Sequence, residues 1–266
     1  MQLIQQMPNQ RTIDKYYQSD YWEKKAYRGE SALGYLSYLA ERESFIDYFQ
    51  KVLKELKDFC PQLGGKVLDI GCSFGFFLKV AQEAGWQIYG LDLSPTPVEQ
   101  AKRKLRVKTI YNKSIEEAKF QANFFDLVTV FQTIEHVVDP EKFLKEIKRV
   151  LKPGGVVLLT TPDAAGWQAR LMGKSWFSYR HPDHFYFFNF ENLSLLLKRV
   201  GFVKIRNLKD PTRLYPLEYL LENVKFYYRG KLFVKLTNFI KKMIGPLGKI
   251  QIPIPLVSLV MIGEKE

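Results

Sequence analysis

The chain has 266 residues and a formal net charge of +12, and 46% of its residues are hydrophobic. This length and apolar content suit one large α/β domain with appended segments and argue against a second full domain. Two cysteines, Cys60 and Cys72, exclude a disulfide framework. The sequence shows no signal-like N-terminus and no unbroken run of about eighteen apolar residues. We therefore expect a cytoplasmic protein with reduced thiols that neither spans a membrane nor is exported.

The segment before the first strand divides into two parts. Residues 1–13 are predicted to form a disordered tail, and residues 14–62 combine a Tyr-rich stretch with a helix over 41–59. The apolar residues of that helix recur at helical spacing, at Phe45, Phe49, Val52, Leu53 and Leu56.

Strands and helices alternate through the core of the chain, residues 63–208. Strands are predicted over 66–70, 87–91, 107–111, 126–131, 155–161 and 203–207. Helices are predicted over 75–84, 95–105, 140–150 and 191–199. Such alternation favours a parallel sheet with right-handed crossovers. A last strand is predicted over 256–263, within residues 253–266.

The turn after the first strand has the composition of a ligand cradle. Gly71 and Gly75 allow close approach of the backbone to a bound molecule, and the following helix points its N–H groups into the same space. About twenty residues later the second strand ends in Asp92, the position of an acid that binds ribose hydroxyls in nucleoside-binding folds. The spacing indicates a nucleoside cofactor.

A dinucleotide is disfavoured because its fingerprint would place glycines at 71, 73 and 76, whereas this chain has Ser73 and Phe76. Residues 69–75 instead resemble the first motif of the class I S-adenosylmethionine-dependent methyltransferases, with serine in place of the middle glycine. Residues 123–137 and 150–162 are similar to the fourth and fifth strands of that family. The nearest resemblance is to bacterial small-molecule enzymes related to the ubiquinone-type O-methyltransferases.

The resemblance implies a Rossmann-like α/β fold, with a seven-stranded, mostly parallel sheet, helices on both faces and the last strand antiparallel. It also implies that the Tyr-rich segment covers the cofactor as a lid, and that the cofactor is S-adenosylmethionine, with S-adenosylhomocysteine as product. The implied ligands are Asp69, Gly71, Ser73 and Gly75 near the methionine moiety, Asp92 at the ribose, Leu93, Ser114 and Ile115 at the adenine, and Phe131 and Gln132 at the methionine end. Core packing is an equal alternative for Ile115. Asp126 opens the fourth strand at the opposite edge and is predicted to be structural.

Three histidines follow strand ends at the carboxyl edge of the sheet, where open α/β sheets bind ligands. His136 follows the fourth strand, and His181 and His184 follow the fifth. Each is a candidate general base, because histidine titrates near neutral pH. Packing or hydrogen bonding is the alternative role, most strongly for His136. We expect no metal, because no Cys or carboxylate cluster accompanies the histidines at ligand spacing.

An aromatic-rich stretch surrounds the last two histidines. It is predicted either to wall an apolar or ring-shaped acceptor or to shield the edge of the sheet. Its members are Trp167, Trp176, Phe177, Tyr179, Tyr186, Phe187 and Phe188.

Residues 209–252 fit the core least well. Apolar residues recur at steps of three and four between 232 and 247, with lysines at 231, 235, 241 and 242, which predicts a basic amphipathic helix. Residues 201–250 hold eleven Lys and Arg against three Asp and Glu. The helix either packs on the sheet or roofs the pocket, or else its segment 231–249 contacts an anionic membrane peripherally at the inner face.

The predicted function is transfer of a methyl group from S-adenosylmethionine to an oxygen of a small, glycan, lipid-linked or quinone-like acceptor. Two alternatives are an RNA methyltransferase and a non-catalytic S-adenosylmethionine-binding protein. A nucleic-acid partner is disfavoured because no RNA-binding module is appended. Moreover, Gln132-Thr133-Ile134-Glu135 replaces the Asn/Asp-Pro-Pro-aromatic tetrad of amino-directed nucleic-acid enzymes.

Overall fold

The computed structural model describes residues 41–180, 184–209, 211, 213–217, 231–254 and 258–266. The predicted tail, the Tyr-rich segment and His181 lie outside the described residues. The described chain divides into two compact units. One is built from residues 49–209 and 258–266, and the other includes residues 41–48, 211, 213–217 and 231–254.

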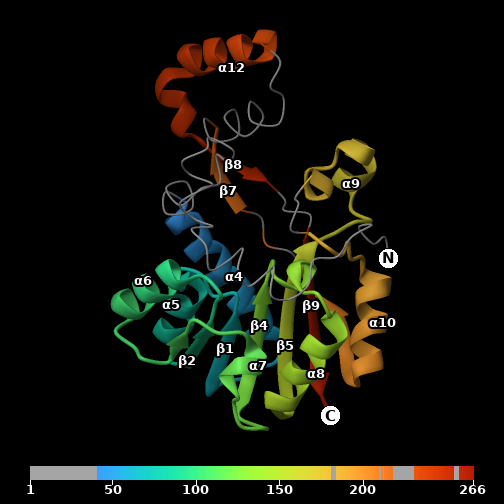
Figure 1. Ribbon diagram of the computed structural model, residues 1–266. Coiled ribbons are helices and arrows are strands. Elements are labelled where there is room, and N and C mark those ends of the chain that lie inside the picture. The colour runs from blue at the N-terminus through green and yellow to red at the C-terminus, as the bar shows by residue number, and fades with distance from the viewer. Residues whose placement is uncertain (1–40, 181–183, 210, 212, 218–230, 255–257) are drawn as a thin grey trace. The chain divides into compact units, whose positions relative to one another are not determined.

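The first unit is built on a seven-stranded sheet (Figure 1). Its strands are β1 (Lys66–Ile70), β2 (Gln87–Leu91), β3 (Ile110–Tyr111), β4 (Phe125–Phe131), β5 (Leu151–Pro162), β6 (Phe202–Asn207) and β9 (Ser258–Lys265). Their order is β3-β2-β1-β4-β5-β9-β6, and β9 runs antiparallel to both β5 and β6. The predicted mostly parallel sheet with an antiparallel last strand is confirmed.

One helix precedes these strands and the others connect them. They are α4 (Arg42–Phe59), α5 (Phe76–Glu83), α6 (Pro95–Leu105), α7 (Ile115–Ala118), α8 (Pro140–Val150), α9 (Trp167–Met172) and α10 (Phe190–Val200). The crossover β1–α5–β2 steps one way along the sheet and β4–α8–β5 steps the other way. Since both are right-handed, α5 and α8 cover opposite faces.

Local sequence sets the ends of these helices. The Asp139 carboxylate accepts the backbone N–H of Lys142 at 3.0 Å and starts α8. Asn189 and Asn192 accept each other's backbone N–H at the start of α10, and Gly201 ends that helix with φ of 89°. The longer helices then bury an apolar stripe; in α8 the stripe consists of Phe143, Leu144, Ile147 and Val150.

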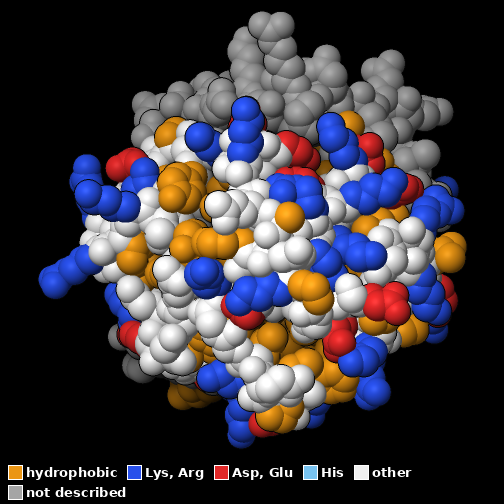
Figure 2. Space-filling model, turned by 90° about the horizontal axis from the view of Figure 1, so that it is seen from below, with side chains coloured by type: hydrophobic (Ala, Val, Ile, Leu, Met, Phe, Trp, Pro, Cys, Tyr) orange, Lys and Arg blue, Asp and Glu red, His pale blue; other side chains and the backbone are white. Residues whose placement is uncertain are grey.

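The amino edge of the sheet carries structural charge pairs. Asp126 accepts the backbone N–H of Lys66 at 2.8 Å and pairs with Lys152 at 2.7 Å, which confirms its predicted structural role. Nearby on α8, Lys145 pairs with Glu141 at 2.7 Å. Figure 2 shows this end of the molecule, where Lys and Arg are interspersed with Asp and Glu. The basic excess of the chain therefore forms no single-signed field on this face.

The second unit contains a short antiparallel strand pair, β7 (Arg213–Pro216) and β8 (Gln251–Ile254), which the sequence did not predict. Between these strands the chain forms α12 (Lys231–Ile244), followed by the 3₁₀ helix η4 (Gly245–Lys249). The predicted amphipathic helix is thus confirmed. No helix in the described part of the chain is both long and apolar enough to cross a membrane.

Candidate active site

The site lies where the strand order reverses, between β1 and β4. These strands are parallel neighbours, with Asp69 opposite Thr129 and Ile70 opposite Val130. Their carboxyl ends therefore release the β1–α5 turn and the β4–η1 loop side by side, where η1 is the short 3₁₀ helix Ile134–His136. A crevice at such a switch point is where open α/β sheets bind ligands.

The β1–α5 turn depends on three left-handed residues. Gly71 has φ of 79° and Gly75 has φ of 72°. A Cβ on Gly71 would collide with the Thr133 hydroxyl, so glycine is required there for packing as well as for conformation. Ser73 has φ of 45°, a left-handed conformation that glycine adopts more readily than serine. The serine thus preserves the turn at some cost in backbone strain.

Asp92 holds this turn in place. Its two carboxylate oxygens accept the backbone N–H groups of Ser73 and Ser94, each at 2.8 Å. Burial raises the pKa of Asp92, and the two amide hydrogen bonds oppose that shift. Because each oxygen has a second lone pair, the carboxylate can still accept ribose hydroxyls.

Asp69 at the end of β1 is almost fully buried. The Thr129 hydroxyl donates to its carboxyl at 2.8 Å. Burial, reinforced by the charge of Asp92, raises the pKa of Asp69 to about 8. A bound cation would reverse this effect and favour the carboxylate. The Ser73 hydroxyl is also buried and has no hydrogen-bond partner among the described residues, so it is available to a ligand.

The remaining cofactor candidates lie in different environments. Phe131 packs against Phe49 and Phe77, with ring centroids 4.7 and 4.9 Å apart. Gln132 is exposed, has φ of 46°, and donates its backbone N–H to the Thr160 carbonyl at 2.9 Å. A left-handed non-glycine residue at the tip of a strand is a feature of functional sites.

Ser114 and Ile115 have structural roles in the chain itself. Ser114 caps α7, and its hydroxyl accepts the Glu117 N–H at 3.3 Å. Ile115 belongs to the buried hydrophobic core, while Leu93 is half-buried beside Asp92. The adenine contacts of these three residues stay predictions.

A second cluster forms after β4, where Glu135, His136 and His184 come together. One potential ligand atom from each lies within 4.8 Å of those of the other two. The rings of His136 and His184 meet edge to face, with centroids 4.7 Å apart. Glu135 and His184 are buried and His136 is half-buried. Such a set can pass a proton between imidazole and a neighbouring group, and the carboxylate can stabilise the charged ring.

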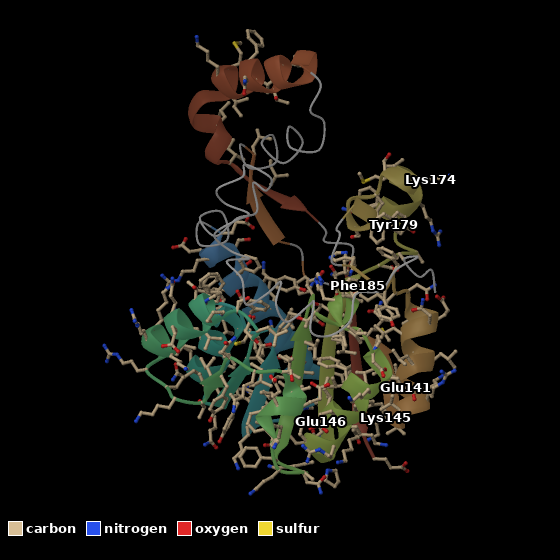
Figure 3. All side chains as sticks on the ribbon, viewed as in Figure 1. Glu141, Lys145, Glu146, Lys174, Tyr179 and Phe185 are labelled. Carbon is tan, nitrogen blue, oxygen red and sulfur yellow. The ribbon has the colours of Figure 1, made fainter. Side chains whose placement is uncertain are left out.

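Backbone hydrogen bonds bring His184 to this place. The N–H groups of Phe185 and Tyr186 both donate to the Glu135 carbonyl, at 2.8 and 3.3 Å. The Tyr186 hydroxyl donates to the Val138 carbonyl at 2.8 Å. Figure 3 places Phe185 near the carboxyl ends of β4 and β5, far from Glu146 at the opposite edge.

Glu135 was not singled out from the sequence. Its only signal was its place beside His136 in the loop after β4, since the contact with His184 spans about fifty residues. The sequence showed no carboxylate at ligand spacing from the histidines. The fold supplies one by bringing Glu135 together with His184. The absence of a metal stays a prediction.

Aromatic residues gather on the same connection after β5. The Tyr179 ring lies 5.0 Å from Trp176 and 4.7 Å from Phe187, edge to face in both cases. Trp176 is buried, while Tyr179 is exposed. Because Trp176 is buried, a ligand can contact this aromatic cluster only through its exposed rings, such as Tyr179.

The comparison with known families decides the class of the domain. Residues 38–207, more than half of the chain, match the family model described as a methyltransferase domain. The chain belongs to this family. Its glycine turn and acids agree with a class I S-adenosylmethionine-dependent methyltransferase, as predicted.

Curated relatives include ubiquinone biosynthesis O-methyltransferases. The Haemophilus ducreyi enzyme is 33% identical over 107 residues, which cover 37% of this chain and 45% of the enzyme. The Vibrio cholerae enzyme is 35% identical over 103 residues, covering 37% and 42%. The mitochondrial enzyme of Schizosaccharomyces pombe is 30% identical over 122 residues, covering 44% and 43%. The chain spans less than half the length of these relatives.

Solved structures share the fold. A methyltransferase from Thermotoga maritima has a TM-score of 0.58 and 20% identity, covering 92% of this chain and 98% of its own. Phosphoethanolamine N-methyltransferase 2 of Haemonchus contortus, solved with S-adenosyl-L-methionine, has a TM-score of 0.53 and 22% identity, covering 80% and 51%.

The cofactor of this methyltransferase domain is S-adenosylmethionine. The residues present fit that molecule. The Ser73 hydroxyl is available, Gly71 leaves space for the close approach of a ligand, and the buried Asp69 would gain from a nearby cation.

Proposed function

We propose that the protein transfers a methyl group from S-adenosylmethionine to a hydroxyl oxygen of a quinone-like acceptor. The observation that carries the proposal is the Glu135–His136–His184 cluster beside the end of β4. The ubiquinone biosynthesis O-methyltransferases among the relatives support the acceptor class.

The cluster suits a hydroxyl that must lose a proton. A phenolic hydroxyl has a pKa of about 10 and histidine one of about 6.5, so a neutral imidazole within hydrogen-bonding reach lowers the barrier to deprotonation. Glu135 stabilises the imidazolium that results. Because the two rings are in contact, charge on one disfavours charge on the other.

The other residues of the site position the reactants. When bound, S-adenosylmethionine supplies a methyl group on a sulfonium cation. Asp92 holds the ribose and keeps the Ser73 turn in place beside the methionine moiety, and the buried carboxyl of Asp69 compensates positive charge. The exposed ring of Tyr179 is available to an aromatic acceptor from the connection that also carries His184. Displacement at the methyl group depends chiefly on this alignment and on exclusion of water.

Two other functions find less support. RNA methylation would use the basic residues of 231–249, but these belong to the second unit, whereas the cluster belongs to the first. A non-catalytic binding protein needs no buried acid and histidine pair beside the cofactor turn.

The test measures methyl transfer to catechol, a minimal quinone-like acceptor, by the full chain with radiolabelled S-adenosylmethionine. His184→Ala should lower kcat about 10²-fold while cofactor affinity is unchanged. The remaining activity should rise with pH toward about pH 10, where the acceptor ionises by itself. Glu135→Gln should also lower kcat, whereas Glu116→Gln, an exposed control on α7, should not.

Three results would overturn the proposal. The first is wild-type kcat in the His184 and Glu135 variants. The second is methyl transfer to RNA in place of catechol. The third is loss of activity with a chelator and recovery with a divalent cation in variants that keep the histidines, which would assign the cluster to an ion.

A further inference from the structure

The second unit carries an exposed apolar stripe on α12 and η4. Leu236, Phe239, Met243, Leu247 and Ile250 are between 49% and 71% exposed. Leu236, Phe239 and Met243 are three and four residues apart in α12, which places them on one face of that helix, and Leu247 and Ile250 follow in and just after η4. We call these five residues the outer stripe.

A neighbouring line of the same helix is the covered one. Thr237 is buried, and Ile240 and Ile244 are half-buried. This second line is therefore the part of α12 that is turned away from solvent. The outer stripe is additional apolar surface, and surface of this kind on a soluble domain marks an interaction site.

The charge of this region has one sign. No Asp or Glu occurs between residues 223 and 263, while lysines occupy 225, 231, 235, 241, 242 and 249. Positions 231, 235 and 242 fall on one line of the helix, directly beside the outer stripe. Lys242 is exposed.

We propose that α12 and η4 bind the surface of an anionic lipid bilayer. The outer stripe enters the boundary between headgroups and acyl chains, and the flanking lysines reach the lipid phosphates. An RNA would use the lysines but leave the apolar stripe in water. A protein groove would bury the stripe without requiring charge of a single sign. The helix spans fourteen residues, which suits a position in the plane of the interface rather than across it.

This inference does not depend on the identity of the methyl acceptor. Its test is sedimentation of the full chain with vesicles of phosphatidylglycerol and phosphatidylcholine, compared with vesicles of phosphatidylcholine alone. We expect binding to the first and not to the second, and weaker binding as the salt concentration rises.

Paired variants separate the contribution of the outer stripe to vesicle binding from the contribution of the lysines. Phe239→Ser with Met243→Ser should weaken vesicle binding at least about tenfold, since both side chains would leave the lipid. Their present exposure means that folding should not suffer, which circular dichroism checks. Lys242→Glu should weaken binding about tenfold by exchanging attraction for repulsion. Matched controls in the first unit, Leu195→Ser on α10 and the exposed Lys108→Glu, should leave binding unchanged.

The proposal is overturned if anionic vesicles do not bind the chain, or if the serine pair binds them as the wild type does. Binding of RNA equally by the wild type and the serine pair, without vesicle binding, would assign the lysines to nucleic acid. A dimer in light scattering that the serine pair dissociates would assign the stripe to a second copy of the chain.

Discussion

The cofactor side and the acceptor side of the site are built in different ways. The cofactor side comes from two adjacent strand ends within residues 69–94, joined by the hydrogen bonds from Ser73 and Ser94 to Asp92. The acceptor side joins Glu135 to His184, about fifty residues later, through backbone bonds to the Glu135 carbonyl. A contiguous motif forms the predicted cofactor side, whereas the proposed acceptor side depends on how a long connection folds back.

The largest effect on cofactor affinity is expected from a change in the glycine turn of the cofactor side. Gly71→Val should abolish S-adenosylhomocysteine binding in calorimetry, because the new side chain meets Thr133 and the backbone has positive φ. Gly85→Val is the matched control, since Gly85 also has positive φ but its Cβ would meet nothing within 4 Å. Wild-type affinity in Gly71→Val would contradict the role of the turn, and equal loss in both variants would show that backbone strain alone, and not the shape of the turn, affects binding.

Asp92→Ala should have a smaller effect on the same side. The ribose hydroxyls lose a charge-assisted acceptor worth about 1.5–3 kcal/mol, so S-adenosylhomocysteine affinity should fall at least roughly tenfold. The Ser73 amide also loses its partner, so the thermal midpoint should fall. Unchanged S-adenosylhomocysteine affinity in a folded Asp92→Ala protein would contradict the prediction that Asp92 binds the ribose of a nucleoside cofactor.

The smallest effect concerns the buried acid at the end of β1. Asp69 has a pKa of about 8 in the folded protein, against an ordinary value of 3.8. The folded state therefore holds a proton that the unfolded state has lost between these values, and stability should fall as the pH rises from about 4 to about 8.

Asp69→Asn should remove part of that pH dependence, as measured by denaturant unfolding without cofactor at pH values across the window. Its amide oxygen can still accept the Thr129 hydroxyl, so the packing of the site is kept. Identical pH dependence in wild type and variant would mean that Asp69 is ionised throughout.

The sequence predicted regular elements well where local signals repeat. The glycine turn and the alternation of strands and helices were predictable because short motifs and apolar periodicity specify them, whereas the antiparallel direction of β9 followed from the family resemblance. The pair β7 and β8 was missed, since its four-residue strands are separated by more than thirty residues and carry no hairpin turn. The predicted strand over 107–111 is reduced to Ile110–Tyr111, because Arg106 ends α6 in a left-handed conformation and Val107 still bonds back to Lys102.

The residues of the candidate site could be predicted to different extents, because local motifs are visible in the sequence and contacts between distant residues are not. The spacing of Asp92 and the family resemblance of residues 69–75 placed Asp69 and Asp92 at the predicted cofactor turn, and their contacts with the cofactor stay predictions. The histidines were visible as residue types at strand ends, but their pairing and the role of Glu135 required the fold. Ser73 shows the limit of a motif, since the chain accommodates a departure from glycine by a left-handed serine.

The most direct test of the division between the two sides is a measurement on the double variant His136→Ala with His184→Ala. Calorimetric titration with S-adenosylhomocysteine and catechol turnover are measured on the same preparation. We predict wild-type cofactor affinity together with loss of turnover of at least about 10²-fold. A fall in cofactor affinity that parallels the fall in turnover would contradict the account, because the histidines would then belong to the cofactor pocket and not to the acceptor side.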